Sequence, residues 1–220
     1  MALMVSHVQV EPVIQQVHLA AGVAGPSELD FDVRCFVITG PSGLVLLDTG
    51  LEGSSPQIEL ALVRARAGWS DITDVILTHS HPDHVGGLTE VTRNAPQAVL
   101  WAGQADASGI RATAPIRPLS DNDYVRDLRV ISTPGHTMGH ISLLHEPASI
   151  LFAGDVVGTM TGEITRAPSQ FTADAAMAEE SLKKLDELRA DRMVFSHGPE
   201  LTDPGTRLHR LVSDGPTPGN

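Results

Sequence analysis

Short runs of aliphatic and β-branched residues alternate with polar turns along most of the chain. Apolar runs of this length that end in Gly, Asp, Ser or Thr are typical of strands. The pattern predicts strands at residues 33–39, 43–47, 74–78, 99–102, 125–133, 141–144, 149–152 and 193–196. The turn Gly40-Pro41-Ser42 joins the first two, which are therefore expected to form a hairpin.

Other segments carry apolar residues at the three-to-four spacing of an amphipathic helix. Residues 56–67 follow this spacing and stop at Gly68. Residues 86–94 are expected to form a second helix, and residues 172–190 a third, with Thr172 as its N-terminal cap. Strands mixed with helices throughout predict a layered α/β or α+β domain, and argue against an all-β sandwich or a helical bundle.

Histidine and aspartate gather just after the predicted strands. Layered folds place their functional sites at such C-terminal strand ends, so these side chains are expected to meet at one edge of the fold. The set comprises Asp48, His79, His81, Asp83, His84, His136, Asp155 and His197.

The run H-x-H-x-D-H at residues 79–84 has the spacing of a metal-binding loop. His79 and His81 are two residues apart, so in extended chain their side chains point the same way. Imidazole and carboxylate donors without a thiolate suit Zn²⁺ above all, with Fe, Mn, Ni or Co as alternatives, and Cys35 is not needed. A single histidine of this kind is more often an ordinary turn residue, but that explanation fails for the whole set.

The composition supports this reading of the histidines. The chain has ten histidines but only eight Phe, Trp and Tyr residues in all. His7, His18, His145 and His209 have no comparable strand-end context and are expected to be ordinary residues.

Length and charge exclude several classes of protein. The 220 residues carry 27 Asp and Glu against 15 Lys and Arg, a formal net charge of −12 without a basic cluster, which disfavours nucleic acid as a partner. One cysteine excludes a disulfide scaffold. No apolar run approaches the length of a membrane span, and no signal peptide is recognised. We expect a cytoplasmic monomer or homodimer with one domain at residues 1–212 and a disordered tail at 213–220. The expected substrate is a small molecule, for which an anion is one alternative.

Taken in order along the chain, these motifs resemble the metallo-β-lactamase fold superfamily. Its hydrolases carry an Asp after an early strand, the H-x-H-x-D-H run, and later a His, an Asp and a His. The counterparts are Asp48 in L-D-T-G, residues 79–84, His136 in G-H-T-M-G-H, Asp155 in A-G-D and His197 in S-H-G. The ordered match covers residues 48–198.

The resemblance implies a four-layer αβ/βα sandwich with a dinuclear, zinc-preferring site. By the family pattern, His79, His81 and His136 would hold one ion, and Asp83, His84 and His197 the other. Asp155 would bridge both ions, while Asp48 and His140 would support the ligands by hydrogen bonds. A hydroxide shared by the two ions would attack a carbonyl carbon, and Asp83 would return a proton to the leaving group.

The substrate class follows less directly, because the family hosts several chemistries. The expected reaction is hydrolysis of an ester, thioester or lactone, as in single-domain relatives of glyoxalase II and the lactonases. However, only 23 residues follow His197, too few for glyoxalase II's helical domain, and Gly158 stands where lactonases carry a tyrosine. β-Lactam hydrolysis is expected to be minor at most.

Two alternatives to the hydrolase remain open. One is a mononuclear iron enzyme resembling persulfide dioxygenases, on His79, His136 and Asp155. The other is a metal-binding protein without turnover on the same scaffold. Specificity is expected from residues 20–32 and 158–171. There Arg166 can meet an anionic group and Leu29, Met160 and Phe171 can form an apolar wall, but a solvated arginine and ordinary packing residues explain these positions equally well.

Overall fold

The computed structural model describes residues 8–22 and 26–215 and contains two six-stranded sheets. The first sheet has its strands in sequence order, with the first three antiparallel and the rest parallel. Its strands are β1 (Gln9–Leu19), β2 (Leu29–Gly40), β3 (Gly43–Leu47), β4 (Ile72–Leu77), β5 (Val99–Gly103) and β6 (Ile116–Leu119). β2 and β3 form the predicted hairpin across the turn at residues 41 and 42.

The second sheet has the order β14-β13-β10-β9-β8-β7. Its strands are β7 (Tyr124–Val125), β8 (Leu128–Ser132), β9 (Ile141–His145), β10 (Ile150–Phe152), β13 (Arg192–Val194) and β14 (Leu201–Thr202). A separate two-stranded ribbon pairs β11 (Val157–Gly158) with β12 (Thr165–Arg166). This ribbon follows β10 directly and lies beside the site described below.

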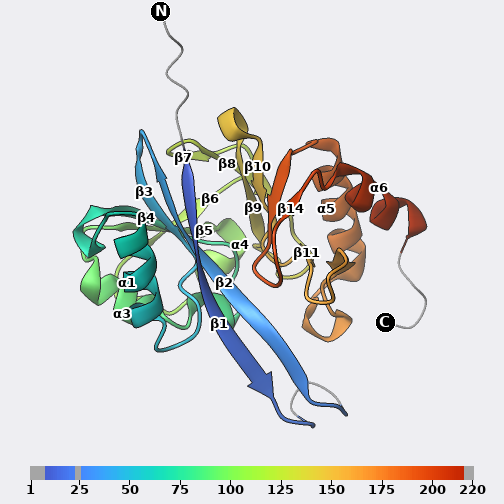
Figure 1. Ribbon diagram of the computed structural model, residues 1–220, viewed down its shortest axis with the longest axis horizontal. Coiled ribbons are helices and arrows are strands. Elements are labelled where there is room, and N and C mark those ends of the chain that lie inside the picture. The colour runs from blue at the N-terminus through green and yellow to red at the C-terminus, as the bar shows by residue number, and fades with distance from the viewer. Residues whose placement is uncertain (1–7, 23–25, 216–220) are drawn as a thin grey trace, which may run out of the picture.

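Helices cover the outer face of each sheet, so the domain has four layers (Figure 1). On the first sheet they are α1 (Ser55–Arg64), α2 (Pro82–Val85), α3 (Leu88–Asn94) and α4 (Gln104–Ala107). On the second they are α5 (Ala175–Glu187) and α6 (Gly205–Asp214). Short 3-10 turns occupy Trp69–Asp71, Glu146–Ala148 and Ser169–Phe171. The mixed α/β class and the αβ/βα layering agree with the prediction.

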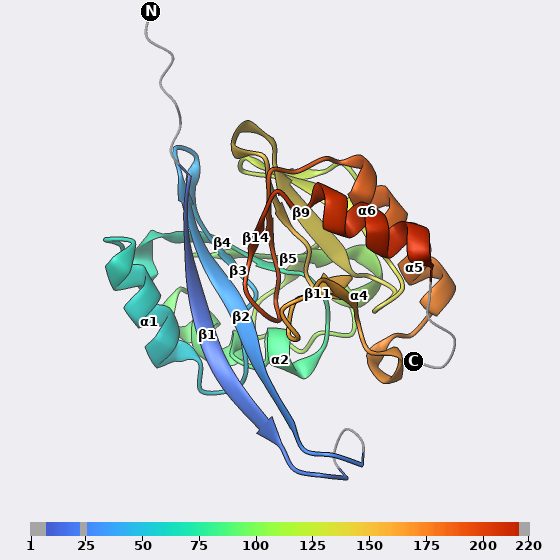
Figure 2. The ribbon, with the colours of Figure 1, turned by 45° about the vertical axis from the view of Figure 1, so that its right-hand side comes forward.

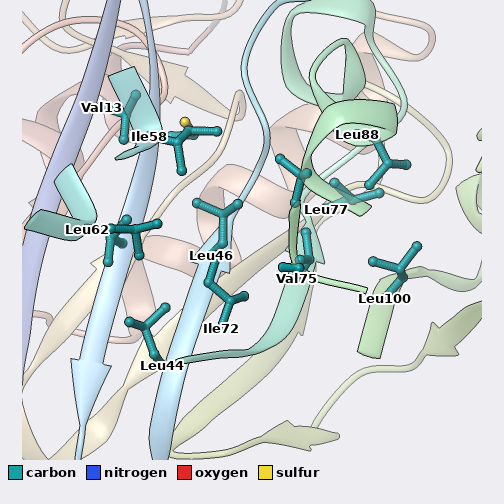
Figure 3. Close-up of a cluster of buried hydrophobic side chains, with 14 of the residues drawn as sticks. Val13, Leu44, Leu46, Ile58, Leu62, Ile72, Val75, Leu77, Leu88 and Leu100 are labelled. Carbon is teal, nitrogen blue, oxygen red and sulfur yellow. The ribbon is translucent and has the colours of Figure 1, made fainter. Parts of the chain in front are cut away.

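Three hydrophobic clusters hold these layers together. Figure 3 shows the outer cluster of the first sheet, where Ile58 and Leu62 of α1 pack against strand residues such as Leu46. The central cluster joins the facing sides of the two sheets, for example Phe36 with Phe152. The third cluster packs α5 and α6 onto the outer face of the second sheet. Alternate residues of β3 face opposite clusters, as the two-residue period of a strand requires.

β1 was not expected from the sequence. Its eleven residues pair antiparallel with β2 along their whole length, and the two strands form a long arm that leaves the body of the domain (Figure 2). Pro12 lies within β1 and interrupts the strand pattern. A proline lacks the N–H that a central strand needs, but an edge strand tolerates it. β1 is the edge of its sheet, which explains both the proline and the missed prediction.

Several predicted boundaries were wrong for local reasons. The strand predicted at 125–133 is two antiparallel strands, β7 and β8, because Arg126 turns the chain with a left-handed backbone. The long helix begins three residues late, since Asp174, and not Thr172, caps it by accepting a bond from the Met177 N–H. Thr172 is in extended conformation. The helix predicted at 86–94 begins two residues later, as α3, and the short helix α2 before it was not predicted.

The two ends of the chain limit what the structure says of the domain bounds. α6 includes Ser213 and Asp214, the first residues of the predicted tail, whereas 216–220 and His7 lie outside the described residues. The domain bounds and the disordered tail therefore stay predictions. Within the described part of the chain, no helix has both the length and the apolar character needed to cross a membrane.

Candidate metal centre

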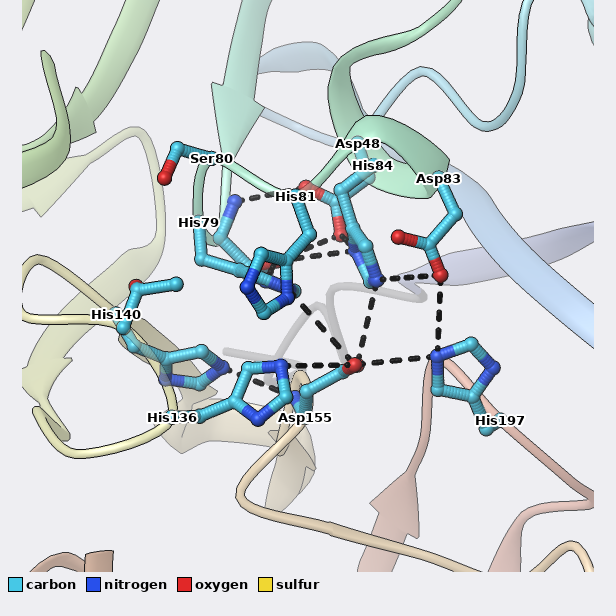
Figure 4. A network of polar contacts seen from close by, with 12 residues as sticks. Asp48, His79, Ser80, His81, Asp83, His84, His136, His140, Asp155 and His197 are labelled. Carbon is cyan, nitrogen blue, oxygen red and sulfur yellow. Dashed lines mark hydrogen bonds and ion pairs between the residues drawn. The ribbon is translucent and has the colours of Figure 1, made fainter. Parts of the chain in front are cut away.

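The five segments that carry the predicted ligands all follow strand ends at one edge of the two sheets. Asp48 follows β3, the run 79–84 follows β4, and His136, Asp155 and His197 follow β8, β10 and β13. Figure 4 shows these side chains converging from both sheets. The two halves of the fold therefore contribute to a single centre between them.

Three groups of donor atoms in this centre lie close enough to hold a metal ion. Within each group the donor atoms are all within 4.8 Å of one another. The groups are His79, His81 and His136; His79, His84 and Asp155; and Asp83, His84 and His197. The first and third groups are the two ligand sets that the family resemblance implied.

Asp155 lies between these groups. Its Oδ2 atom is 3.4 Å from His136 Nε2 and 3.1 Å from His197 Nε2, and its Oδ1 is 3.4 Å from His84 Nε2. The carboxylate therefore reaches donors of the first and third groups at once. Only 8% of the Asp155 side chain is exposed, so its charge needs a cationic partner.

Hydrogen bonds on the far side of the rings aim the imidazoles into the centre. The Asp48 carboxylate accepts bonds from the Thr78 N–H, the Thr78 hydroxyl and His84 Nδ1, the last at 2.9 Å. His197 Nδ1 donates to the carbonyl of Asp32 at 2.7 Å. Because Nδ1 faces an acceptor in both rings, Nδ1 keeps the proton in the form that binds a metal, and the Nε2 lone pairs of His84 and His197 are then directed at the cation.

His140 has both ring nitrogens engaged by the protein. The Asp155 N–H donates to Nε2 at 2.9 Å, so Nδ1 carries the proton and donates to Thr133 Oγ1 at 2.8 Å. Thr133 in turn donates to Ser142, whose hydroxyl donates to the Ala153 carbonyl. His140 therefore supports the loop that carries Asp155, and it has no free lone pair with which to bind a metal.

Orphaned donor atoms test whether a metal fits. Among the described residues, the buried atoms without a hydrogen-bond partner include His84 Nε2, Asp155 Oδ1 and both ring nitrogens of His136. Buried polar atoms are rarely left unpaired, and these four concentrate in one centre. Divalent cations with nitrogen and oxygen ligands would satisfy His84 Nε2, Asp155 Oδ1 and one His136 nitrogen, so the residues fit the metal that the family implies.

Electrostatics sets the protonation of the centre. Burial lowers the pKa of His79 well below its usual range, and burial likewise lowers that of His81. Burial opposes the charge on His84, but the Asp155 and Asp48 carboxylates outweigh it and raise the pKa of that ring. Burial also opposes the charge on Asp155, yet His197 and His84 hold its pKa well below the usual value. Asp155 is therefore an anion and His79 a neutral ring, the forms that bind metal.

Asp106 is an important residue that the sequence did not predict. This buried carboxylate on α4 accepts bonds from the Ser80 N–H at 2.9 Å, the Thr137 hydroxyl at 2.7 Å and the Gly139 N–H at 2.7 Å. It thus joins the loop after β4 to the loop after β8. Its partners are 26 to 33 residues away, so no local motif marks it.

Residues that the sequence set apart from the centre remain outside it. His18 pairs with Asp30, His209 pairs with Asp186, and His145 accepts a bond from the Ala148 N–H. Cys35 is buried in the core. Arg166, for which the sequence left open an anionic group or solvent, pairs through two nitrogens with Glu179.

Comparison with known proteins agrees with the fold described above. A 27% identical relative is a probable metallo-hydrolase, YflN, of Bacillus subtilis, aligned over 74% of this chain and 78% of that protein. A metallo-beta-lactamase family protein of Thermus thermophilus has the same fold, with a TM-score of 0.68, 20% identity and coverage of 92% and 79%. So does AidC, a dizinc quorum-quenching lactonase, with a TM-score of 0.65, 17% identity and coverage of 89% and 92%.

The family model places the chain directly. The model described as the metallo-beta-lactamase superfamily matches residues 30–197, which include every strand-end segment of the centre. The fold, the donor groups and this match lead to one conclusion: the chain belongs to the metallo-beta-lactamase superfamily.

Proposed function

We propose that this protein is a metal-dependent hydrolase that cleaves an ester, thioester or lactone bond of a small molecule at a dinuclear, zinc-preferring site. One observation carries the proposal: two complete donor groups meet at a single buried carboxylate, Asp155. A relative described as a probable metallo-hydrolase and a dizinc lactonase of the same fold support it.

The chain divides its ligands between two positions. His79, His81 and His136 would hold one ion, Asp83, His84 and His197 the other, and Asp155 would contact both. Such ions, when bound, polarise a carbonyl oxygen and lower the pKa of a coordinated water towards about 7. Zinc is preferred because the donors are imidazoles and carboxylates without a thiolate, although iron and manganese accept similar sets.

The protein's own residues orient the ligands and move a proton. Asp48 and the Asp32 carbonyl fix the tautomers of His84 and His197. Asp83 is the most exposed carboxylate of the centre, with 25% of its side chain accessible, and its Oδ2 lies 3.5 Å from His197 Nε2. Water supplies the oxygen that bonds to the carbonyl carbon, the bond to the leaving group breaks, and Asp83 returns the proton that the leaving group needs.

A direct test combines metal analysis with a substrate panel. Protein purified without added metal, and the same protein loaded with Zn²⁺, is assayed on esters, thioesters, lactones and a persulfide. We expect about two ions per chain and turnover of at least one ester-type substrate. One bound ion together with oxidation of the persulfide would indicate a mononuclear iron dioxygenase in place of the hydrolase. Two bound ions without turnover of any substrate would indicate a metal-binding protein.

Variants separate the ligands from the rest of the fold. His81→Ala and Asp155→Ala should each lose bound metal and at least about 99% of turnover, as removal of metal ligands does, while keeping the far-UV circular dichroism of the wild type. His209→Gln, whose ring is 60% exposed on α6, is the control and should keep both metal and turnover. Loss of turnover with full metal content would contradict the ligand roles of His81 and Asp155.

A further inference from the structure

A cavity of about 650 Å³ adjoins the metal centre, and His136 and Asp155 form part of its wall. The rest of the wall comes from residues 156–172, which include β12, and from α5 and α6, which lie next to each other on the second sheet (Figure 1). Its volume is in the range of small-molecule sites, about 300–1,000 Å³. A group held at the metal ligands can therefore extend into this cavity.

Most of the wall is apolar. The apolar lining residues include Val156, Met160, Ala175, Ala178, Leu182 and Leu211. The uncharged polar side chains of the wall are hydroxyls and the Gln170 amide. Such a surface is complementary to hydrocarbon, because removing both from water is favourable.

Charge in the cavity is confined to one internally neutral pair. Apart from His136 and Asp155 of the centre, the charged side chains among the described lining residues are Arg166 and Glu179. Arg166 donates through Nε and Nη2 to the two carboxylate oxygens of Glu179, and Nη2 also donates to the Leu211 carbonyl at 2.9 Å. Both side chains are about four-fifths buried, so the pair presents no net charge to a ligand.

We propose that this cavity binds the uncharged, apolar acyl chain of the substrate, and that Glu179, by neutralising Arg166, excludes acyl chains that end in an anion. The proposal rests on the hydrolase function and names its substrate class. An anionic chain end would lie beside the Glu179 carboxylate and lose its hydration. Arg166 would not compensate for this loss, because it is already paired with Glu179. A methyl end has no charge to desolvate and can pack against the apolar part of the wall.

The first experiment compares two esters of equal length. Nitrophenyl hexanoate and nitrophenyl monoadipate both have six-carbon acyl chains, but the second ends in a carboxylate. We expect kcat/KM of the zinc-loaded wild type to favour hexanoate by at least about tenfold. From butanoate to octanoate, kcat/KM should rise by about two- to fourfold per methylene.

Glu179→Gln removes the negative charge and keeps a hydrogen-bond acceptor for Arg166. We expect this variant to raise the monoadipate-to-hexanoate ratio of kcat/KM by at least about tenfold. Glu180→Gln is the matched control, because it makes the same charge change one residue along α5. Glu180 is 73% exposed, pairs with Lys183 and does not line the cavity, so its ratio should match the wild type.

Binding without turnover gives a second readout that needs no variant. Methyl hexyl ketone and the keto acid of the same length, with a terminal carboxylate, are titrated against zinc-loaded wild type by saturation-transfer NMR. We expect the ketone to bind and to be displaced by nitrophenyl hexanoate or its product, and the keto acid to bind at least about tenfold more weakly.

The outcomes separate this proposal from the hydrolase function. Preference for the ketone without hydrolysis of any ester would support the apolar cavity and overturn the proposed reaction. Hydrolysis with equal or better use of monoadipate by the wild type would overturn the apolar specificity. An unchanged ratio in folded Glu179→Gln, or an equal change in Glu180→Gln, would overturn the role given to Glu179.

Discussion

Replacing Asp106 tests whether a buried carboxylate holds the two metal-binding loops together. Asp106→Asn changes one oxygen to an N–H₂ group and leaves the shape of the side chain intact. If the amide oxygen keeps the Gly139 bond, the new N–H₂ group faces the Ser80 N–H, and that bond is lost. The Thr137 hydroxyl can turn round and become an acceptor, but its bond is then no longer to a charged group.

The size of the effect follows from the three bonds. A hydrogen bond to a charged group contributes about 1.5–3 kcal/mol, and a buried donor left unpaired costs about 1–3 kcal/mol. Losing the Ser80 bond and weakening the other two should lower the free energy of unfolding by about 2–3 kcal/mol in Asp106→Asn. Asp106→Ala removes all three acceptors and should cost about 4 kcal/mol or more.

The free energy of unfolding is measured by urea unfolding at pH 7 in the presence of EDTA. Zinc affinity is measured separately on folded, EDTA-free protein, by titration against a chromophoric chelator. Because Asp106 positions Ser80 between His79 and His81, and Thr137 next to His136, we expect zinc affinity to fall by about tenfold or more in Asp106→Asn. The N–H of Ser80 and the hydroxyl of Thr137 both point at one oxygen, so a shift of either loop should move the donors of the first group apart.

Asp121→Asn is the matched control for this prediction. Asp121 also accepts three hydrogen bonds, from Ser132, Lys184 and Asn122, but its side chain is 39% exposed and water can replace them. Its loss should stay below about 1 kcal/mol, with unchanged zinc affinity. Equal destabilisation of the two variants, or an unaltered zinc affinity in Asp106→Asn, would refute the reasoning.

Two further predictions concern buried groups near the centre. Burial and the Asp48 carboxylate raise the pKa of the Cys35 thiol. The folded protein should therefore react with a thiol reagent only as fast as it unfolds locally, whereas the denatured protein should react within minutes. Rapid labelling of the folded protein would contradict this. Burial, reinforced by His136, lowers the pKa of His140 to about 3. An unfolded histidine titrates near 6.5, so between pH 6 and 4 the unfolded chain binds a proton that the folded chain does not. His140 therefore reduces stability by up to about 1.4 kcal/mol for each unit that the pH falls, and His140→Gln in EDTA should show a correspondingly shallower pH dependence. If stability depended on pH equally in the wild type and in His140→Gln, the His140 ring would be protonated in the folded protein, contrary to this prediction.

The strand-end placement of the candidate ligands was predictable because it depends on local pattern. Each candidate lies within a few residues of an apolar run, and such a run predicts a strand whichever sheet it joins. Register along β3 and β4 then sets the Asp48 and His79 loops side by side, since parallel neighbours end at the same edge. The family resemblance added the division of ligands into two sets, which spacing alone leaves open.

Features with distant or irregular causes were not predictable in this way. β1 contains a proline and is stabilised by its pairing with β2, not by its own pattern. The break between β7 and β8 depends on the left-handed backbone of Arg126, a residue type without a preference for turns. Neither Pro12 nor Arg126 indicates its conformation by itself.

The partners of charged side chains around the site are the feature that the sequence predicts least well. An arginine near a metal loop predicts anion binding only if it has no carboxylate partner, and the partner of Arg166 is Glu179, 13 residues away on another element. The same holds for Asp106, whose role depends on donors from two loops. Metal ligands must come from residue types that are recognisable in any sequence, whereas the groups that aim and neutralise them can be any polar residue that the fold brings near. Substrate specificity in this protein is therefore expected to depend on pairs such as Arg166 and Glu179, and a single substitution at Glu179 should change it without touching a metal ligand.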